Sequence, residues 1–438
     1  MSAPALVIPP QLRPFRRVGR VTRVVGLEIE VRGLGGGIGD AVLLGPPDRR
    51  IRAEVVAIAG DASIVMPLGP ADGLAPNDPA ELAGGRTRLA VGDALRGRVL
   101  DAFGDPIDGH GALGGGAAGH SLDHVDVDEP APSPLARRRI DTPLPLGVRA
   151  LDALLPCGRG QRVGVFAGSG VGKSTLLGMM ARGAGADAVV VGLIGERGRE
   201  VREFLEDDLG PEGRELATVF VATSDEPAMV RVRAAFAATR LAEWHAAQGR
   251  DVLLLMDSLT RVAMAQREIG LAAGEPPTTR GYPPSVFALL ASLLERSGPH
   301  PRGTITGLYT VLVEGDDLDE PITDHARSIL DGHYVLSRRL ATAGQFPAID
   351  VPASASRLVS KILPGEQRAK VAHVRSLLSA LAEGRDLLEL GAYVPGTNPV
   401  LDEALAKRAT LDRLLRQDAL HVSSWDDAVS ALDQVVLA

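Results

Sequence analysis

Cysteine, lysine and aromatic residues are all scarce in this chain of 438 residues. The single cysteine, Cys157, excludes an intramolecular disulfide framework and fits a protein kept in a reducing compartment. Aromatic residues make up 3% of the chain and hydrophobic residues 45%, so the cores must be packed from aliphatic side chains. Only four of the 47 basic residues are lysines, which makes the position of each lysine informative.

Positive net charge and long apolar runs are also absent. The formal charge is −8 at pH 7, which argues against a general electrostatic attraction to nucleic acid. No run approaches the roughly 18 uninterrupted apolar residues that a membrane-spanning helix needs. The first ten residues lack a charged n-region and are interrupted by prolines, so we expect no signal peptide. These absences predict a cytoplasmic protein that does not bind nucleic acid.

The length of the chain suggests about three domains, and the sequence pattern changes along it accordingly. Residues 1–16 show no regular pattern and are expected to be disordered, whereas the β-prone runs of 17–90 predict an all-β barrel. In residues 91–360, which include a Gly- and Pro-rich connector at 110–140, apolar strands alternate with amphipathic helices. Residues 361–438 have helical periodicity. The predicted fold is an α/β core with a mainly parallel sheet, an N-terminal barrel and a C-terminal helical domain.

The same patterns give the bounds of the individual elements. Barrel strands are expected at 19–25, 27–31, 41–44, 51–58 and 63–66. Core strands are expected at 162–167, 187–194, 217–222, 251–256, 303–312 and 332–336, with helices at 173–183, 197–208, 226–248, 258–268 and 284–296. The C-terminal helices are expected at 364–383, 399–416 and 424–436.

A glycine-rich loop links the first core strand to its helix and predicts a phosphate-binding loop. Lys173 could reach the β- and γ-phosphates, and the Ser174 hydroxyl could bind Mg²⁺. The usual first glycine is replaced by Ala167, and an ordinary glycine-rich turn is the alternative in a chain with 51 glycines. A lysine at 173 in an arginine-rich chain favours nucleotide binding. The residues expected to hold the nucleotide are Ala167, Gly168, Ser169, Gly170, Val171, Gly172, Lys173, Ser174 and Thr175.

Two acidic residues stand where neighbouring apolar strands are expected to end. Glu196 and Arg197 follow the strand at 187–194, and Glu196 could polarise a water toward a γ-phosphate or merely cap the next helix. Asp257 ends the apolar run of 252–256 and could lie near Mg²⁺. Because ligands of such sheets lie beyond the carboxyl ends of the strands, both carboxylates are expected beside the glycine loop.

Five long strings resemble the type III export ATPases, and among these the flagellar export ATPases in particular. They are residues 164–175, 192–201, 256–270, 274–287 and 331–338, and the likeness extends from about residue 17 to 432. This family is related to the catalytic subunit of rotary ATP synthases. The resemblance implies a RecA-like P-loop ATPase core, assembly as a homohexamer, and nucleotide bound between neighbouring subunits.

The resemblance also implies roles for individual residues. Glu196 matches the catalytic glutamate of the family, and Arg261 matches an arginine of the site that follows the metal-side aspartate. Arg357 falls where the family has an arginine that reaches into the neighbour's site. Phe346 falls at the aromatic that packs on adenine, although a core phenylalanine is the alternative. The catalytic set implied in this way is Lys173, Glu196, Arg197, Asp257, Arg261 and Arg357, with ATP and Mg²⁺ bound.

The family further implies partners and a place in the cell. The loop at 274–284 corresponds to the family's pore-facing loop, which would meet a central stalk protein. A regulatory stator-like subunit, a membrane export gate, export substrates and chaperones are the other expected partners. The enzyme would be cytoplasmic and peripheral to the inner membrane. The N-terminal stretch contains Pro9, Pro10 and Pro14, which do not suit the amphipathic helix that binds the regulator in flagellar members.

The predicted activity is therefore ATP hydrolysis that energises protein export through a flagellar type III apparatus. An injectisome ATPase shares nearly the same core motifs and is the first alternative. A rotary ATP synthase subunit and a non-hydrolysing assembly subunit are two others, and retained Glu196, Asp257 and Arg357 speak against the latter. An RNA-dependent hexameric helicase would need a basic or aromatic-rich N-terminal platform, which the chain lacks.

Overall fold

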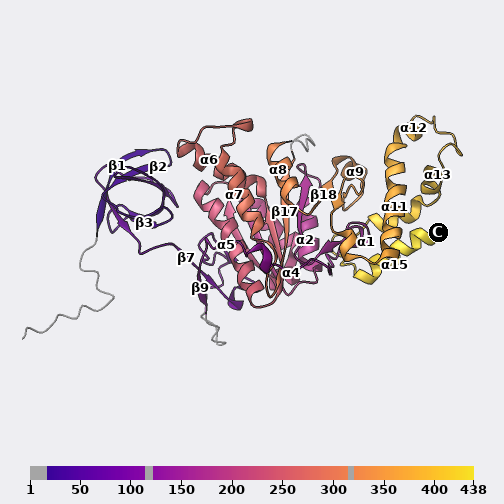
Figure 1. The fold of residues 1–438 in the computed structure, drawn as a ribbon, viewed down its shortest axis with the longest axis horizontal. Coiled ribbons are helices and arrows are strands. Elements are labelled where there is room, and N and C mark those ends of the chain that lie inside the picture. The colour runs from indigo at the N-terminus through magenta and orange to yellow at the C-terminus, as the bar shows by residue number, and fades with distance from the viewer. Residues whose placement is uncertain (1–16, 114–121, 314–319) are drawn as a thin grey trace, which may run out of the picture. The chain divides into compact units, whose positions relative to one another are not determined.

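The computed structural model describes residues 17–113, 122–313 and 320–438 (Figure 1). The expected disorder of residues 1–16 concerns a segment outside this part of the chain. The described residues form two compact units, an N-terminal one with the barrel and a second with the core sheet and the C-terminal helices. No helix within the described ranges is both long and apolar enough to cross a bilayer.

Six strands close the N-terminal barrel in the order β1-β2-β5-β4-β3-β6. Every neighbouring pair is antiparallel, and alternate side chains such as Val21, Ile29, Val31 and Val42 fill the interior. Five strands lie where the sequence predicts them, whereas β6 was missed because its residues, Pro-Ala-Glu-Leu, include no β-branched side chain. The bounds are β1 Val18–Val25, β2 Glu28–Arg32, β3 Ala41–Leu44, β4 Ile51–Ala59, β5 Ala62–Pro67 and β6 Pro79–Leu82.

The core sheet of the second unit has the order β19-β18-β12-β17-β15-β13-β14-β8 and is parallel except at its β19 edge and at β16, which pairs with β17. The prediction of a mainly parallel sheet is confirmed. The bounds are β8 Val99–Leu100, β12 Arg162–Ala167, β13 Ala188–Glu196, β14 Ala217–Thr223, β15 Asp251–Asp257, β16 Gly298–Pro299, β17 Thr304–Leu312, β18 Gly332–Leu336 and β19 Ala355–Ser356. The strands are buried on both faces, which explains their continuous apolar runs.

Helices cover both faces of this sheet. Val190 and Leu254 pack with α5, whereas their neighbours Val191 and Leu255 point the other way and pack with α2 and the C-terminal helices. The prediction of one helix over 197–208 is only partly right, because α3 continues as the π-helical segment η3. The bounds are α1 Arg149–Leu154, α2 Lys173–Gly183, α3 Gly198–Glu203, η3 Phe204–Asp208, α4 Gly210–Leu216, α5 Ala228–Ala247, α6 Leu259–Ala272, α7 Pro284–Glu295, α8 Pro321–Ile329, α9 Arg338–Thr342 and α10 Val359–Ile362.

The expected connector at 110–140 contains more structure than predicted. Its strand β9 (Asp123–Asp126) forms a small sheet with β7 (Arg88–Val91). Trp244 of α5 donates its indole N–H to Asp123 at 3.0 Å, which ties β9 to the core. The Gly- and Ala-rich residues 114–121 of the connector are outside the described ranges.

The C-terminal helices pack on the face of the core that carries α1. Contacts of α1 with α15 and α11, together with Leu377, Leu411, Leu414 and Leu432, make them continuous with the core's apolar cluster. The predicted helix at 399–416 is two helices, because Lys407 has non-helical backbone angles. The bounds are α11 Gly365–Glu383, α12 Arg385–Glu389, α13 Pro399–Ala406, α14 Arg408–Leu415 and α15 Trp425–Leu437.

Candidate functional site

The glycine loop leaves β12 at Ala167 and enters α2 at Lys173. Gly170 and Gly172 have φ values of 75° and 88°, in the left-handed region that side-chain-bearing residues rarely adopt. Val171 between them is 1% exposed and anchors the loop to the core. The turn therefore ends with the free N–H groups of the first turn of α2, which is the arrangement that binds phosphate oxygens.

Lys173, Asp257 and Glu196 meet beside this loop. The Lys173 Nζ lies 2.6 Å from Asp257 Oδ1 and 3.5 Å from Glu196 Oε1. The two acids are the last residues of β15 and β13, which are neighbours in the parallel sheet. The carboxyl ends of these strands thus bring together three side chains that lie 84 residues apart in the sequence at most.

Burial sets the electrostatics of this cluster. Removal from water, aided by the negative charge of Asp257 and a hydrogen bond with Glu200, raises the pKa of Glu196 to about 7 against the opposing effect of Lys173. Burial alone would lower the pKa of Lys173, but the two carboxylates outweigh it and raise that pKa. The lysine stays charged, while Glu196 can take up or release a proton near neutral pH.

Thr310 also belongs to the site, and sequence reasoning missed it. It lies on β17, the strand between the glycine-loop strand β12 and the Asp257 strand β15, and it is 0% exposed. Its hydroxyl donates to Asp257 Oδ1 at 2.6 Å. The Lys173 ammonium and the Thr310 hydroxyl therefore both donate to the same oxygen of Asp257, Oδ1. The segment 303–312 contains three threonines, Thr304, Thr306 and Thr310, so the sequence alone did not single out Thr310.

The two hydroxyls after Lys173 have different surroundings. Ser174 is half-buried in the first turn of α2. It directly follows Lys173, whose Nζ pairs with Asp257. Thr175 instead hydrogen-bonds the carboxylate of Asp208 on η3, whose pKa is raised by burial. A serine hydroxyl and a carboxylate are oxygen ligands of the kind that Mg²⁺ takes, so Ser174 and Asp257 fit this ion. The described residues contain no cluster of three or more His, Cys, Asp or Glu that could bind another metal.

Arg261 and Arg197 differ in their burial. Arg261 of α6 packs against Gly195, where an added Cβ would lie 2.8 Å from the arginine Cβ. Its Nε is buried and has no hydrogen-bond partner among the described residues. The Arg197 side chain is 72% exposed, and its Nη1 lies 3.3 Å from Glu200 Oε1.

The ring of Phe346 lies against the glycine loop. A Cβ on Gly172 would lie 3.8 Å from its Cδ1 and Cε1 atoms, and the residue is 49% exposed. A core phenylalanine would be buried, so the alternative raised from the sequence is wrong for this position. A half-exposed aromatic ring next to a phosphate loop offers a flat apolar surface to a nucleobase.

Arg357 lies at the other end of the sheet strands. Its N–H donates to the carbonyl of Asp331 at 3.0 Å, and its neighbour Ser356 pairs with Gly332 at the start of β18. The glycine loop follows the opposite end of β12, where Ala167 pairs with Leu336 of β18. Four residues of strand, roughly 13 Å, separate the two ends, so Arg357 cannot reach its own glycine loop.

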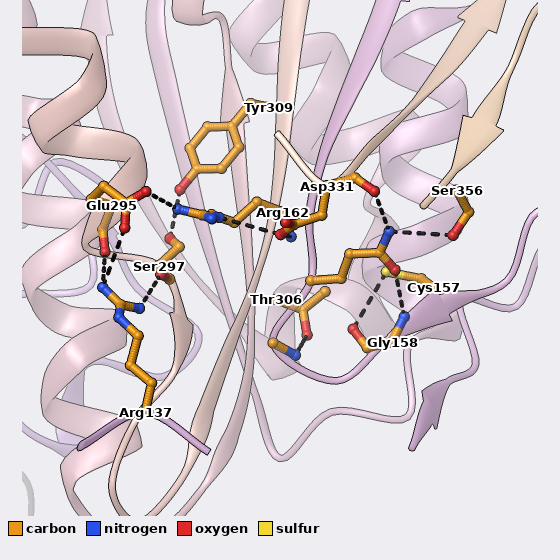
Figure 2. Close-up of polar contacts among 12 residues, drawn as sticks. Arg137, Cys157, Gly158, Arg162, Glu295, Ser297, Thr306, Tyr309, Asp331 and Ser356 are labelled. Carbon is orange, nitrogen blue, oxygen red and sulfur yellow. Dashed lines mark hydrogen bonds and ion pairs between the residues drawn. The ribbon is translucent and has the colours of Figure 1, made fainter. Parts of the chain in front are cut away.

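A cavity of about 820 Å³ also lies at these amino ends of the strands. Figure 2 shows Arg162 at this place between Glu295 and Asp331. Its Nη1 lies 2.6 Å from Glu295 Oε1, and its Nε lies 3.3 Å from Asp331 Oδ2. This cavity lies at the opposite end of the strands from the glycine loop. A smaller cavity of about 170 Å³ adjoins the loop and is lined by Phe166, Ala167, Gly168, Val313, Val335, Leu336, Ser337 and Asp350.

Comparisons with known proteins agree with this fold. The family model "ATP synthase alpha/beta family, nucleotide-binding domain" matches residues 147–356, and "T3SS EscN ATPase C-terminal domain" matches residues 363–434. The flagellum-specific ATP synthase of Bacillus subtilis is 48% identical over 421 residues, covering 95% of both chains. The type 3 secretion system ATPase of Xanthomonas euvesicatoria is 45% identical over 423 residues, covering 96% of this chain and 94% of the relative.

A solved structure is similar over nearly the whole chain. It is the assembled ATPase EscN in complex with its central stalk EscO from the type III secretion system of enteropathogenic E. coli. The TM-score is 0.87 at 42% sequence identity, with 95% of this chain and all of the other covered. The barrel, the core sheet and the C-terminal helices are therefore the fold of this known assembly's subunit.

Proposed function

Because this chain belongs to the type III export ATPases, it is an ATP-hydrolysing enzyme of protein export, and we propose that it hydrolyses ATP at the Lys173 site to energise a flagellar export apparatus. One observation carries this proposal. Lys173, Glu196 and Asp257 converge at the carboxyl ends of parallel strands, beside a glycine loop in which Ser169 and Gly170 are exposed. We retain the domain bounds 17–90, 91–360 and 361–438 as part of the proposal.

Each residue of the cluster has a distinct task in phosphoryl transfer. Lys173 and the loop N–H groups hold the phosphates, and Glu196 accepts a hydrogen bond from the attacking water and orients it. Thr310 and Lys173 fix the carboxylate of Asp257. Ser174 and Asp257, the latter through water, would hold Mg²⁺, which neutralises phosphate charge when bound. Such chemistry depends on placement and charge neutralisation, and this set supplies both.

The position of Arg357 supports a site shared between subunits. A guanidinium at the far end of the strands can stabilise the charge on the γ-phosphate only if a second copy of the chain presents its own glycine loop there. The structurally similar EscN is assembled. We therefore propose a homohexamer in which each nucleotide lies between neighbours, with Arg261 and Arg197 completing the site and Phe346 packing on adenine.

Magnesium dependence tests the activity directly. Phosphate release from ATP by the purified chain is expected to stop when EDTA removes Mg²⁺ and to return when Mg²⁺ is restored in excess, because without Mg²⁺ the phosphate charge beside Ser174 and Asp257 is not neutralised. Release is measured with a coupled phosphate assay. Added single-stranded RNA is expected to leave the rate unchanged, and a strong stimulation by RNA would favour the helicase alternative. Undiminished hydrolysis in EDTA would contradict the proposed site.

The pKa of Glu196 predicts how the rate depends on pH. With a pKa of about 7, raised by burial, the ionised and water-orienting form of Glu196 increases as pH rises. The rate at saturating ATP and Mg²⁺ is therefore expected to rise about tenfold from pH 6 to pH 8 and then level off. The residual rate of Glu196→Gln should lack this step. A flat profile in the parent enzyme would show that the ionisation of Glu196 does not limit the reaction.

The machine and its partners follow from the family. Several relatives with high identity are flagellum-specific ATP synthases, which favours a flagellar apparatus over an injectisome. Flagellar rod and hook genes beside its gene would settle this choice. EscN binds its central stalk, so we propose that the 274–284 loop meets an equivalent stalk protein. A stator-like regulator, an export gate, substrates and chaperones complete the partners, at the cytoplasmic face of the inner membrane.

A further inference from the structure

We propose that Arg416 and Gln417, in the C-terminal helical domain, are positioning residues that hold Phe346 in place for the nucleobase. The two residues follow α14 directly. They lie in the segment matched by the C-terminal domain model, whereas Phe346 lies in the segment matched by the nucleotide-binding model. The inference rests on the proposed ATP site, because it gives a task to residues outside the ATPase core.

Gln417 connects the loop that follows α9 and carries Phe346, here called the Phe346 loop, to the core. Its backbone N–H donates to the carbonyl of Phe346 at 3.0 Å. Its side-chain amide donates to the carbonyls of Gly147 and His421 at 2.8 and 2.7 Å, and its Oε1 accepts from the N–H of Arg149 at 2.7 Å. The residue is 8% exposed, so all these bonds lie in a place with little competing water.

Arg416 holds the same loop two residues earlier. Its Nη1 donates to the carbonyl of Gly344 at 2.5 Å. Consecutive residues of the C-terminal domain thus bind the backbone on either side of Gln345. Arg182, at the end of the P-loop helix α2, in turn donates to the carbonyl of Ala419. The segment 416–419 is therefore tied to both the Phe346 loop and the helix that carries Lys173.

This arrangement matters because the Phe346 ring itself is poorly restrained. It is 49% exposed and lies near Gly172 on one side, so packing alone does not fix it. The loop N–H groups of Gly344 and Gln345 bond back to α9, which shapes the turn but leaves its distance from the core open. The bonds from Arg416 and Gln417 set that distance. A ring placed in advance binds a base without the entropy cost of ordering the loop.

Gln417→Met and Arg416→Ala test the proposal. Methionine keeps the size of the side chain but removes the three side-chain bonds that fix residue 417, so that its backbone N–H no longer holds the Phe346 carbonyl at a set place. Arg416→Ala removes the bond to Gly344 and leaves Gln417 intact. Both are expected to raise KM for ATP roughly three- to tenfold, which is less than the full loss of one stacking contact between a base and an aromatic ring would cause. The kcat is expected to stay within about twofold of the parent value. The inhibition constant of inorganic triphosphate, which has no base, should not change. Arg416→Lys, which can still donate to Gly344, should restore KM.

Matched controls are available on exposed surfaces. Gln434→Met in α15 and Arg413→Ala in α14 remove the same chemical groups where they do not contact the Phe346 loop, and their KM should equal that of the parent. An unchanged KM in both Arg416→Ala and a folded Gln417→Met would overturn the proposal. So would a parallel rise in the inhibition constant of triphosphate, which would indicate a general distortion of the loop.

Phe346→Ala separates this proposal from the proposed function. If Phe346→Ala raises KM for ATP but the Arg416 and Gln417 variants do not, the positioning role fails while the ATP site stands. If Phe346→Ala also leaves KM unchanged, the ring has no contact with the base and the positioning role fails with it. Hydrolysis by the parent enzyme is measured in the same assays. If the parent does not hydrolyse ATP, the proposed function fails, and this outcome is distinct from failure of the positioning role.

Discussion

Glu196→Gln is expected to bind ATP as the parent enzyme does but to hydrolyse it about 10²- to 10⁴-fold more slowly. Glutamine keeps the size and the hydrogen-bonding ability of the side chain but cannot carry the negative charge that draws a water proton. Lys173 would lose one of its two carboxylate neighbours and keep Asp257 at 2.6 Å, so the phosphate-binding part of the site stays intact. Single-turnover phosphate release measures the loss, and a fluorescent nucleotide measures the binding.

Glu203→Gln is the matched control for this change. Glu203 lies on α3, the helix that follows Glu196, and its side chain is about half exposed and pairs with Arg199 at 2.6 Å on the surface. The same loss of charge there should leave hydrolysis near the parent level. If Glu196→Gln folds, binds ATP and hydrolyses it as fast as the parent, Glu196 is only the end of β13 before α3, and another group must orient the water.

The core was predictable because its sequence patterns are local. Strands buried on both faces must be apolar throughout, so β12 at Arg162–Ala167 matches the expected bounds and β15 extends only one residue further, to Asp257. Short amphipathic pieces such as α8 and α12 carry too few turns to show a period, and they were missed. The break at Lys407 was also missed, since it contains neither Gly nor Pro.

The site could be predicted only where the sequence places its residues at the ends of strands. Glu196 and Asp257 end strands that are apolar runs, and Lys173 ends the glycine loop that follows another such strand. The rule for parallel sheets then brings the three side chains together. Thr310 lies inside such a run, and its bond to Asp257 depends on β17 being inserted between β12 and β15, which no local pattern reveals. The distance between Arg357 and the glycine loop likewise depends on the register of β18.

Mixing two inactive variants, Lys173→Ala and Arg357→Ala, is expected to restore hydrolysis. Alone, each should be close to inactive, because one cannot hold the phosphates and the other lacks an arginine contribution of about 10³- to 10⁵-fold. In a mixed ring, an Arg357→Ala subunit still has Lys173, and a Lys173→Ala neighbour still has Arg357. Random 1:1 assembly makes about a quarter of all interfaces complete, so about a quarter of parental activity is the upper expectation.

The double variant makes this experiment specific to a shared site. Lys173→Ala mixed with the double variant has no subunit with Lys173, and Arg357→Ala mixed with it has none with Arg357, so neither mixture should hydrolyse ATP. Arg357 lies at the amino ends of the strands and Lys173 at their carboxyl ends, so recovery can come only from contact between subunits. Mixed rings shown to contain both single variants, yet inactive, would place the arginine that assists Lys173 elsewhere in the chain.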